Sequence, residues 1–144
     1  MTGPPAVCKE GKRHMKLFTL DQLEAIADAL GDTKSGLTNP EIALLLASAK
    51  MVDPGKMTKR VRIYNAFAES QNSKRNRTNI LEFIRLAMSP ARYSREPYRF
   101  EPMRALLNQA LAFAGLVVDE AGRLSSSEPA MTLPQAQRRA RELR

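Results

Sequence analysis

Apolar residues recur every three or four positions along much of the chain, the spacing that places them on one face of an α-helix. The clearest case is the segment 18–31, where Leu20, Leu23, Ile26, Ala27 and Leu30 form one stripe that ends at a glycine. The same periodicity predicts four more core helices, at 39–50, 58–70, 79–88 and 101–115, and a terminal helix at 131–144. The pattern therefore predicts a mainly α-helical fold.

Residues that cap helices precede several of these segments. In a capping box, a Ser or Thr side chain accepts a hydrogen bond from the third helical amide, and a Glu or Gln at that third position returns one. The pattern occurs three times, in Thr19 with Gln22, Thr38 with Glu41, and Thr132 with Gln135. In an alternative register, Asn39 caps the second helix and Pro40 is its first residue. Caps at Thr58 and Asn79 are expected for the helices at 58–70 and 79–88.

The segment 116–126 breaks the helical pattern, because short apolar runs there flank an Asp-Glu-Ala-Gly turn, which predicts a β-hairpin. A helix pair, a later helix and a hairpin also follow one another in winged helix-turn-helix proteins, with 58–70 as recognition helix and 116–126 as wing. The connection "MVDPGKMT" is longer than the usual turn of that motif. We expect a compact helical domain of five to six helices with one small hairpin, and a winged helix-turn-helix as one candidate arrangement.

Composition divides the chain into three parts. Residues 1–16 are polar, basic and rich in Pro and Gly, which predicts a flexible tail. Residues 17–130 form the predicted helical domain, and the helix at 131–144 is expected to lead into a further, C-terminal domain. No apolar run approaches the ~20 residues of a membrane span. The start lacks the apolar centre of a signal peptide, and the single Cys8 fits a reducing compartment, so we expect a cytoplasmic protein without membrane contact.

Positive charge is concentrated in one part of the chain. The net charge is +8 over 144 residues, and residues 56–104 alone carry a net +8. Residues 17–55 carry a net −4, and the two ends carry +3 and +1. A concentrated basic surface attracts polyanions, so nucleic acid is the expected partner, and a merely solvated basic surface is the alternative.

Three groups of cations make up this basic part. One group lies in the first turn of the helix at 58–70, where the partial positive charge of a helix N-terminus disfavours cations but favours a bound phosphate. Arg and Lys side chains bind phosphates, and an exposed tyrosine can stack on a base. The predicted nucleic-acid-binding residues are Lys59, Arg60, Arg62, Lys74, Arg75, Arg77, Arg92, Tyr93, Arg95 and Arg99. In the alternative, Arg60 and Arg62 pair with the acidic helices at 20–50 and Tyr93 lies in the core.

The sequence contains few residues that could form a catalytic or metal-binding site. The single His14 and Cys8 both lie in the predicted tail, where no partner group is held in place. Asp21, Glu24 and Asp28 share one helical face, but no second cluster supplies the six or more oxygens that a hard cation takes. We expect no catalytic residue, no metal site and no cofactor.

Several segments of the chain resemble the N-terminal domain of the Ymh-type family of abortive-infection, AbiJ-like proteins. The segments that carry the resemblance are "LTNPEIALLL", "KRVRIYNAFAESQN", "ILEFIRLAMSPARY", "FEPMRALLNQALAFAGL" and "TLPQAQRRARELR", within residues 17–144. In that family the domain precedes a HEPN-type domain, which often cleaves RNA. The resemblance implies a role in bacterial anti-phage defence and a HEPN-type effector as a partner, but no catalytic residue.

These observations predict a non-catalytic nucleic-acid-binding module, acting as sensor or targeting domain of a defence protein. One alternative is a protein-interaction domain that controls a HEPN-type ribonuclease, with the acidic face at 21–32 as a possible contact. A transcription regulator that places the helix 58–70 in the major groove is another.

Overall fold

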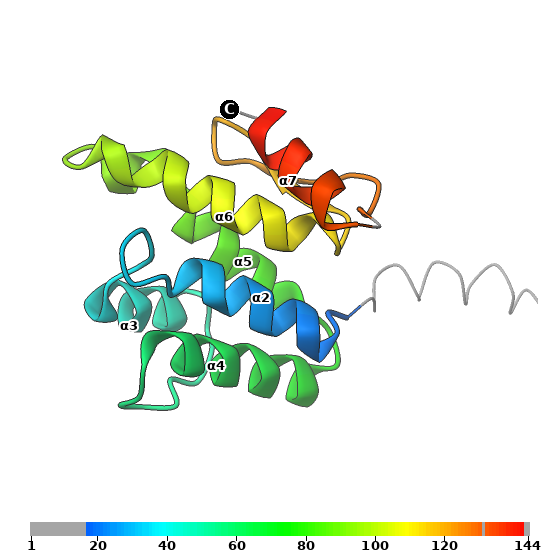
Figure 1. The fold of residues 1–144 in the computed structure, drawn as a ribbon. Helices are drawn as coiled ribbons and strands as arrows, with labels where there is room; N and C mark the ends of the chain where they lie inside the picture. Colours follow the sequence, from blue (N-terminus) through cyan, green and yellow to red (C-terminus); the bar gives the residue numbers. More distant parts are fainter. Residues whose placement is uncertain (1–16, 131, 143–144) are drawn as a thin grey trace, which may run out of the picture.

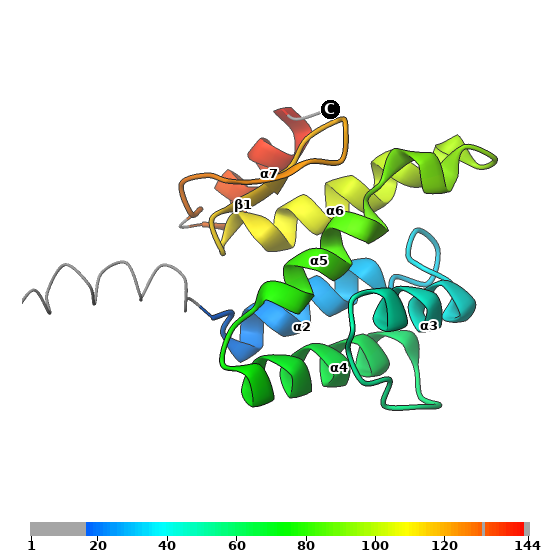
Figure 2. The same ribbon diagram turned by 180° about the vertical axis from the view of Figure 1, so that it is seen from behind.

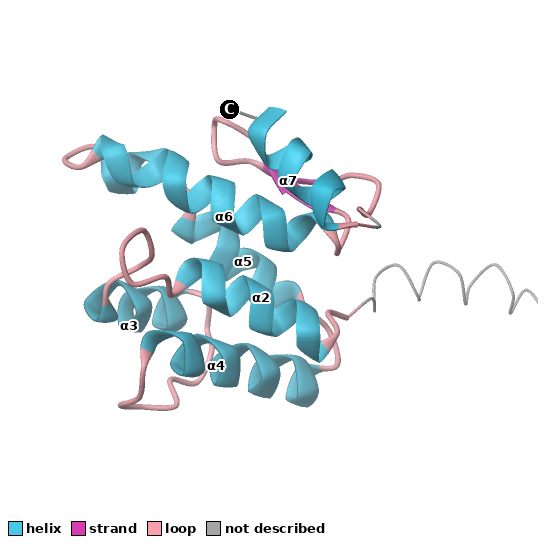
Figure 3. Ribbon diagram, in the orientation of Figure 1, coloured by secondary structure: helices cyan, strands magenta, loops and turns pink. Residues whose placement is uncertain are grey.

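The computed structural model describes residues 17–130 and 132–142, and within them it is mainly helical with one two-stranded hairpin (Figures 1 and 3). The α-helices are α2 (Leu20–Leu30), α3 (Asn39–Ser48), α4 (Lys59–Lys74), α5 (Thr78–Ala87), α6 (Phe100–Ala112) and α7 (Leu133–Glu142). The strands are β1 (Leu116–Val118) and β2 (Leu124–Ser126). The predicted helices and hairpin are thus confirmed. The tail predicted for residues 1–16, with Cys8 and His14, lies outside the described residues.

The predicted caps begin some of the helices but not all. Both partners of each capping box are hydrogen-bonded at Thr19 and at Thr38, which settles the register of α3. Thr58 precedes α4, but its side chain makes no capping hydrogen bond. The prediction for α5 is wrong, because this helix begins one residue before Asn79, which instead donates to the Ala49 carbonyl at 2.8 Å.

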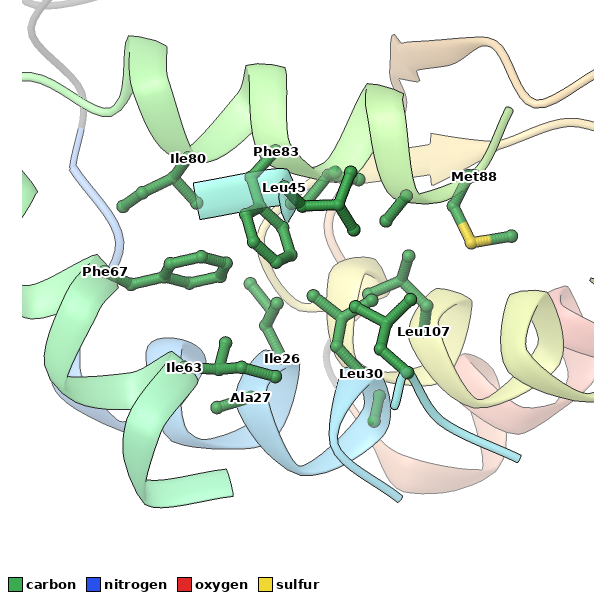
Figure 4. Close-up of a cluster of buried hydrophobic side chains, with 14 of the residues drawn as sticks. Ile26, Ala27, Leu30, Leu45, Ile63, Phe67, Ile80, Phe83, Met88 and Leu107 are labelled. Carbon is green, nitrogen blue, oxygen red and sulfur yellow. The ribbon is translucent and has the colours of Figure 1, made fainter. Parts of the chain in front are cut away.

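Helix α2 lies in the middle of the molecule, with α4 along one side and α6 along the other (Figure 1). Helices α3 and α5 lie behind it, as the reverse view shows (Figure 2). The side chains that point inward from these helices form one apolar core. At its centre, the rings of Phe67 and Phe83 meet edge to face, 5.1 Å apart, among Ile26, Leu30 and Leu107 (Figure 4).

The hairpin is attached to α6 by buried polar side chains. Asn108 binds both the amide and the carbonyl of Val118 in β1, at 2.9 and 3.0 Å, and Arg104 donates to the same carbonyl at 2.9 Å. At the hairpin turn, a Cβ on Gly122 would stand 2.1 Å from the Met88 carbonyl oxygen, so only glycine fits there. The hairpin therefore lies beside α6 and α7, whereas α4 lies on the far side of α2 (Figures 1 and 2). It does not flank α4 as a wing flanks a recognition helix.

The segment between α5 and α6 contains two short 3₁₀ helices, η1 (Pro90–Tyr93) and η2 (Pro97–Arg99). Each begins at a proline, whose fixed φ suits the first turn of a helix. No helix of the described residues has the length and apolar character needed to cross a membrane.

The N-terminal end of the described domain is held by one side chain of α4. Gln71 accepts from the Phe18 amide and donates to the Phe18 carbonyl, both at 2.9 Å, and both residues are buried. One amide side chain therefore satisfies two backbone groups that water cannot reach.

Replacing Gln71 by alanine should lower the free energy of unfolding by about 2–4 kcal/mol, because two buried backbone groups lose their partners. Urea unfolding followed by circular dichroism measures the change. The matched control is N72A at the neighbouring exposed position, expected to stay within about 0.5 kcal/mol of the unmodified protein. Equal effects of both substitutions would contradict this role for Gln71.

Candidate interaction surfaces

The cations at the start of α4 lie beside the C-terminal end of α2. The two helices run antiparallel (Figure 1). They approach closely at Gly31, where a Cβ would stand 3.0 Å from the backbone nitrogen of Arg60. Lys59 Nζ donates to the Asp32 carbonyl at 3.1 Å, and Arg60 approaches the Asp32 carboxylate at 4.0 Å. The last turn of α2 contains no basic residue of its own. Lys59 and Arg60 are unfavourable at the N-terminus of α4, but they interact favourably with the partial negative charge at the C-terminal end of α2.

Arg62 is held more tightly, in the same region. Its guanidinium binds both carboxylate oxygens of Asp53 and also approaches Asn39, the first residue of α3. The Arg62 hydrogen bond lowers the pKa of Asp53. Only 13% of the Arg62 side chain is exposed. The predicted pairing with an acid thus exists, but the acid lies in the connection before α4 rather than in a helix.

Arg99 binds the other side of the start of α3. It makes two hydrogen bonds to the Glu41 carboxylate, at 2.7 and 3.0 Å, and one to the Gly36 carbonyl at 3.2 Å. A second carboxylate, that of Glu96, accepts from it at 3.0 Å. The bond from Arg99 is the main reason why the pKa of Glu41 falls from its ordinary 4.5 to about 2. In return, Glu41 raises the pKa of Arg99.

Tyr93 is a core residue, so its predicted stacking on a base is wrong. Only 2% of it is exposed, and its hydroxyl donates to the Ala87 carbonyl at 2.6 Å. One face of its ring lies under the Arg99 guanidinium, and Phe100 packs beside it. Burial raises the pKa of the Tyr93 hydroxyl. The neighbouring Arg92 is partly buried, and its Nε has no hydrogen-bond partner in the described part of the chain.

Lys74, Arg75 and Arg77, which are also among the predicted nucleic-acid-binding residues, lie in the turn between α4 and α5. Lys74 and Arg75 are exposed, and neither forms an ion pair within the described residues. Arg75 ends α4 in the left-handed conformation, with φ of 60°. Arg77 lies over the ring of Phe18, 4.8 Å from its centre, and burial lowers its pKa. We call these three cations the basic turn.

Helix α5 begins inside the basic turn with an open N-terminus. Its N-cap residue, Arg77, makes no side-chain capping bond. Asn76 accepts from the Thr78 amide at 3.1 Å, and the amide of the partly exposed Asn79 has no hydrogen-bond partner among the described residues, whereas Ile80 is fully buried. Free amides of this kind and nearby cations are the groups that bind a phosphate at a helix N-terminus.

The predicted cations do not form one patch. The segment 90–99, with the exposed Arg95, and the basic turn lie at opposite ends of the molecule in both views (Figures 1 and 2). The structure brings Arg62 and Arg99 together around the start of α3, where both are held by acids. This arrangement could not be predicted from local sequence patterns, because the partners of Arg99 lie up to 63 positions away along the chain.

A different surface lies along α2. Asp21, Glu24 and Asp28 follow one another on its outer side, and all three are exposed. A hollow of about 420 Å³ separates this side from α4, and another of about 360 Å³ separates it from α6 and α7. Within the part of the chain that the structure describes, no group of three or more acidic, His or Cys side chains could hold a metal ion.

The charge on Glu41 should stabilise the fold in a pH-dependent way. Because its pKa is lower in the folded than in the unfolded chain, the stabilisation is complete above about pH 4.5 and disappears as the pH falls toward about 2. E41Q keeps the capping acceptor but removes the charge, and should cost about 1–3 kcal/mol at pH 7. Urea unfolding at pH 7, 4.5 and 3 should show a shrinking difference.

The matched control for this experiment is E69Q. Glu69 is exposed on α4 and forms no ion pair with any described residue, so its replacement should have a small effect at every pH. A difference for E41Q that stays the same from pH 7 to pH 3 would show that the charge of Glu41 is not what stabilises the start of α3.

Comparison with known proteins adds no relative to this description: no family model, no curated protein and no solved structure matches the chain.

Proposed function

We propose that this protein is a non-catalytic nucleic-acid-binding module and that the basic turn is its phosphate contact. The observation that carries this proposal is the open start of α5 inside a group of three cations. Lys74 and Arg75 are exposed and unpaired among the described residues, so binding a phosphate costs them no existing ion pair. The free amide of Asn79 and the cations then act on the same anion.

The basic turn is a better phosphate site than the start of α4, the place that the sequence suggested. Helix α4 also lacks a side-chain cap, and a hollow of about 350 Å³ lies over its first turn. There, however, Lys59 is already bound to a carbonyl and Arg60 faces the Asp32 carboxylate. A phosphate would meet an acid and the negative end of α2, whereas no acid pairs with the basic turn among the described residues.

The resemblance to the AbiJ-like family supports placing this module in a bacterial anti-phage defence protein of the cytoplasm. In this proposal the module senses or targets nucleic acid for a HEPN-type effector. A transcription regulator has less support, because the hairpin does not lie beside α4 as a wing would (Figure 2).

Reversing the charge of Lys74 should weaken nucleic-acid binding. Each phosphate contact contributes a slope of about −0.9 to the dependence of log K on log salt. K74E should therefore lower affinity by about tenfold at 50 mM salt and reduce that slope by about one. Fluorescence anisotropy with labelled duplex DNA and structured RNA, between 50 and 200 mM salt, measures both values.

The matched control is K56E, which reverses an exposed lysine in the connection before α4 and leaves the same net charge as K74E. It should bind almost as tightly as the unmodified protein. If both variants lose affinity equally, the attraction is general and the basic turn is not the site. If the unmodified protein binds neither nucleic acid at 50 mM salt, the proposed function is wrong.

A further inference from the structure

The hollow between α2 and α4 combines an apolar floor with an acidic wall. Leu20 and Val61 line it from the two helices with 61% and 48% of their surfaces exposed, and Tyr64 completes the apolar side. Asp21, Glu24 and Asp28 line the same hollow. We call these six residues, together with Ala27 and Arg60, which also line the hollow, the α2–α4 groove. Leu20 lies at the start of α2 and Val61 next to Arg60 near its end, so exposed apolar side chains stand toward both ends of the hollow.

The acidic wall is not neutralised within the described domain. None of its three carboxylates forms an ion pair with a described residue. Arg60 of α4 also lines the hollow, but the carboxylate that it approaches is that of Asp32. The wall therefore carries three carboxylates that form no ion pair with a described residue, next to an apolar surface, and Arg60 is the one cation among the residues that line the hollow. A ligand complementary to both features is itself apolar on one side and basic along its edge.

We propose that the α2–α4 groove binds a basic amphipathic helix of a partner protein. A groove between two antiparallel helices is straight, and the eleven residues of α2 span about 16 Å, which corresponds to three turns of a partner helix. Large apolar side chains of the partner, three or four positions apart, contact Leu20, Val61 and Tyr64. Lys or Arg side chains on its flank contact the acidic wall.

The charges at the two ends of the groove determine the direction of the bound helix. The acidic wall begins at Asp21, in the first turn of α2, and Arg60 lies at the opposite end of the hollow. The C-terminal end of a helix carries partial negative charge, so it is favoured next to Arg60. The partner helix therefore runs parallel to α2, with its N-terminal half and most of its cations beside Asp21 and Glu24.

The groove shares no residue with the basic turn, whose Arg77 lies over Phe18 just before the start of α2, and its ligand has the opposite charge. The proposal does not depend on nucleic-acid binding. A module with both surfaces can hold a polyanion and a basic protein segment at the same time.

The test uses the whole 144-residue chain and a synthetic 14-residue helical peptide with Leu on one face and Arg along its flank. A reference peptide carries Glu in place of each Arg. Isothermal titration calorimetry and backbone NMR shifts report affinity and location. We expect saturable binding of the Arg peptide only, with the largest shifts at residues 20–28 and 60–64.

Two groove variants and one control make the result specific. E24K should weaken peptide binding by about tenfold through charge reversal, and L20S by about fivefold through lost apolar contact. The control is E120K in the exposed hairpin turn, which changes the net charge as E24K does and should bind normally. Both groove positions are exposed, so neither variant removes a core contact.

Equal weakening by E24K and E120K would overturn the proposal, because it would show that the peptide responds to any surface carboxylate rather than to the groove. Binding of the Glu peptide, or the absence of shifts in α2 and α4, would overturn it as well. The K74E variant should bind the Arg peptide normally and lose only nucleic acid, so failure of one proposal is distinguishable from failure of the other.

Discussion

The arrangement of this domain depends on how the connection between α2 and α3 is held. Residues 31–38 have no apolar side chain in the core other than Leu37, and cations from distant segments bind them and the start of α3 instead. Lys59 binds Asp32, Arg62 binds Asn39, and Arg99 binds Gly36 and Glu41. These contacts join α4 and the start of α6 to one short connection. They hold the start of α3 against α4 and the start of α6. The charged groups that make these contacts already have partners and are not free to bind a ligand.

These cations are paired, and two groups of charged side chains without an ion-pair partner lie on other surfaces of the described domain. The cations that hold the connection are neutralised where they stand, mainly by Glu41 and Asp53. The acids on the outer side of α2 receive no such partner among the described residues, and neither does the basic turn at the far end of α4. An overall net charge of +8 therefore hides an acidic groove and a basic turn. A single value of net charge does not reveal these two surfaces of opposite charge.

Local patterns in the sequence predicted the elements, and contacts between distant residues decided the site. Thr19 and Thr38 were correct as caps because a capping box needs only residues three positions apart. Asn79 failed as a cap because its side chain finds a distant carbonyl, that of Ala49. For Tyr93 the sequence left stacking on a base and burial in the core as alternatives, and the structure shows burial. The carboxylate of Glu41, which binds Arg99, lies 58 positions away, so no local pattern indicated this pair. The acidic face of α2 was visible in the sequence, but the apolar side chains of α4 that complete the groove were not.

The energies of the contacts explain why Arg62 and Arg99, which the sequence predicted to bind phosphates, are poorly suited to do so. A phosphate contact contributes about 1 kcal/mol at physiological salt, according to the counterion-release slope. Removing Arg99 from a paired, partly buried carboxylate such as Glu41 costs more than this, on the order of 2–5 kcal/mol. Nucleic acid therefore gains nothing by competing for Arg62 or Arg99. It gains most where cations and helix amides are still free, which is why the basic turn, rather than the start of α4, is the place where a polyanion is expected to bind.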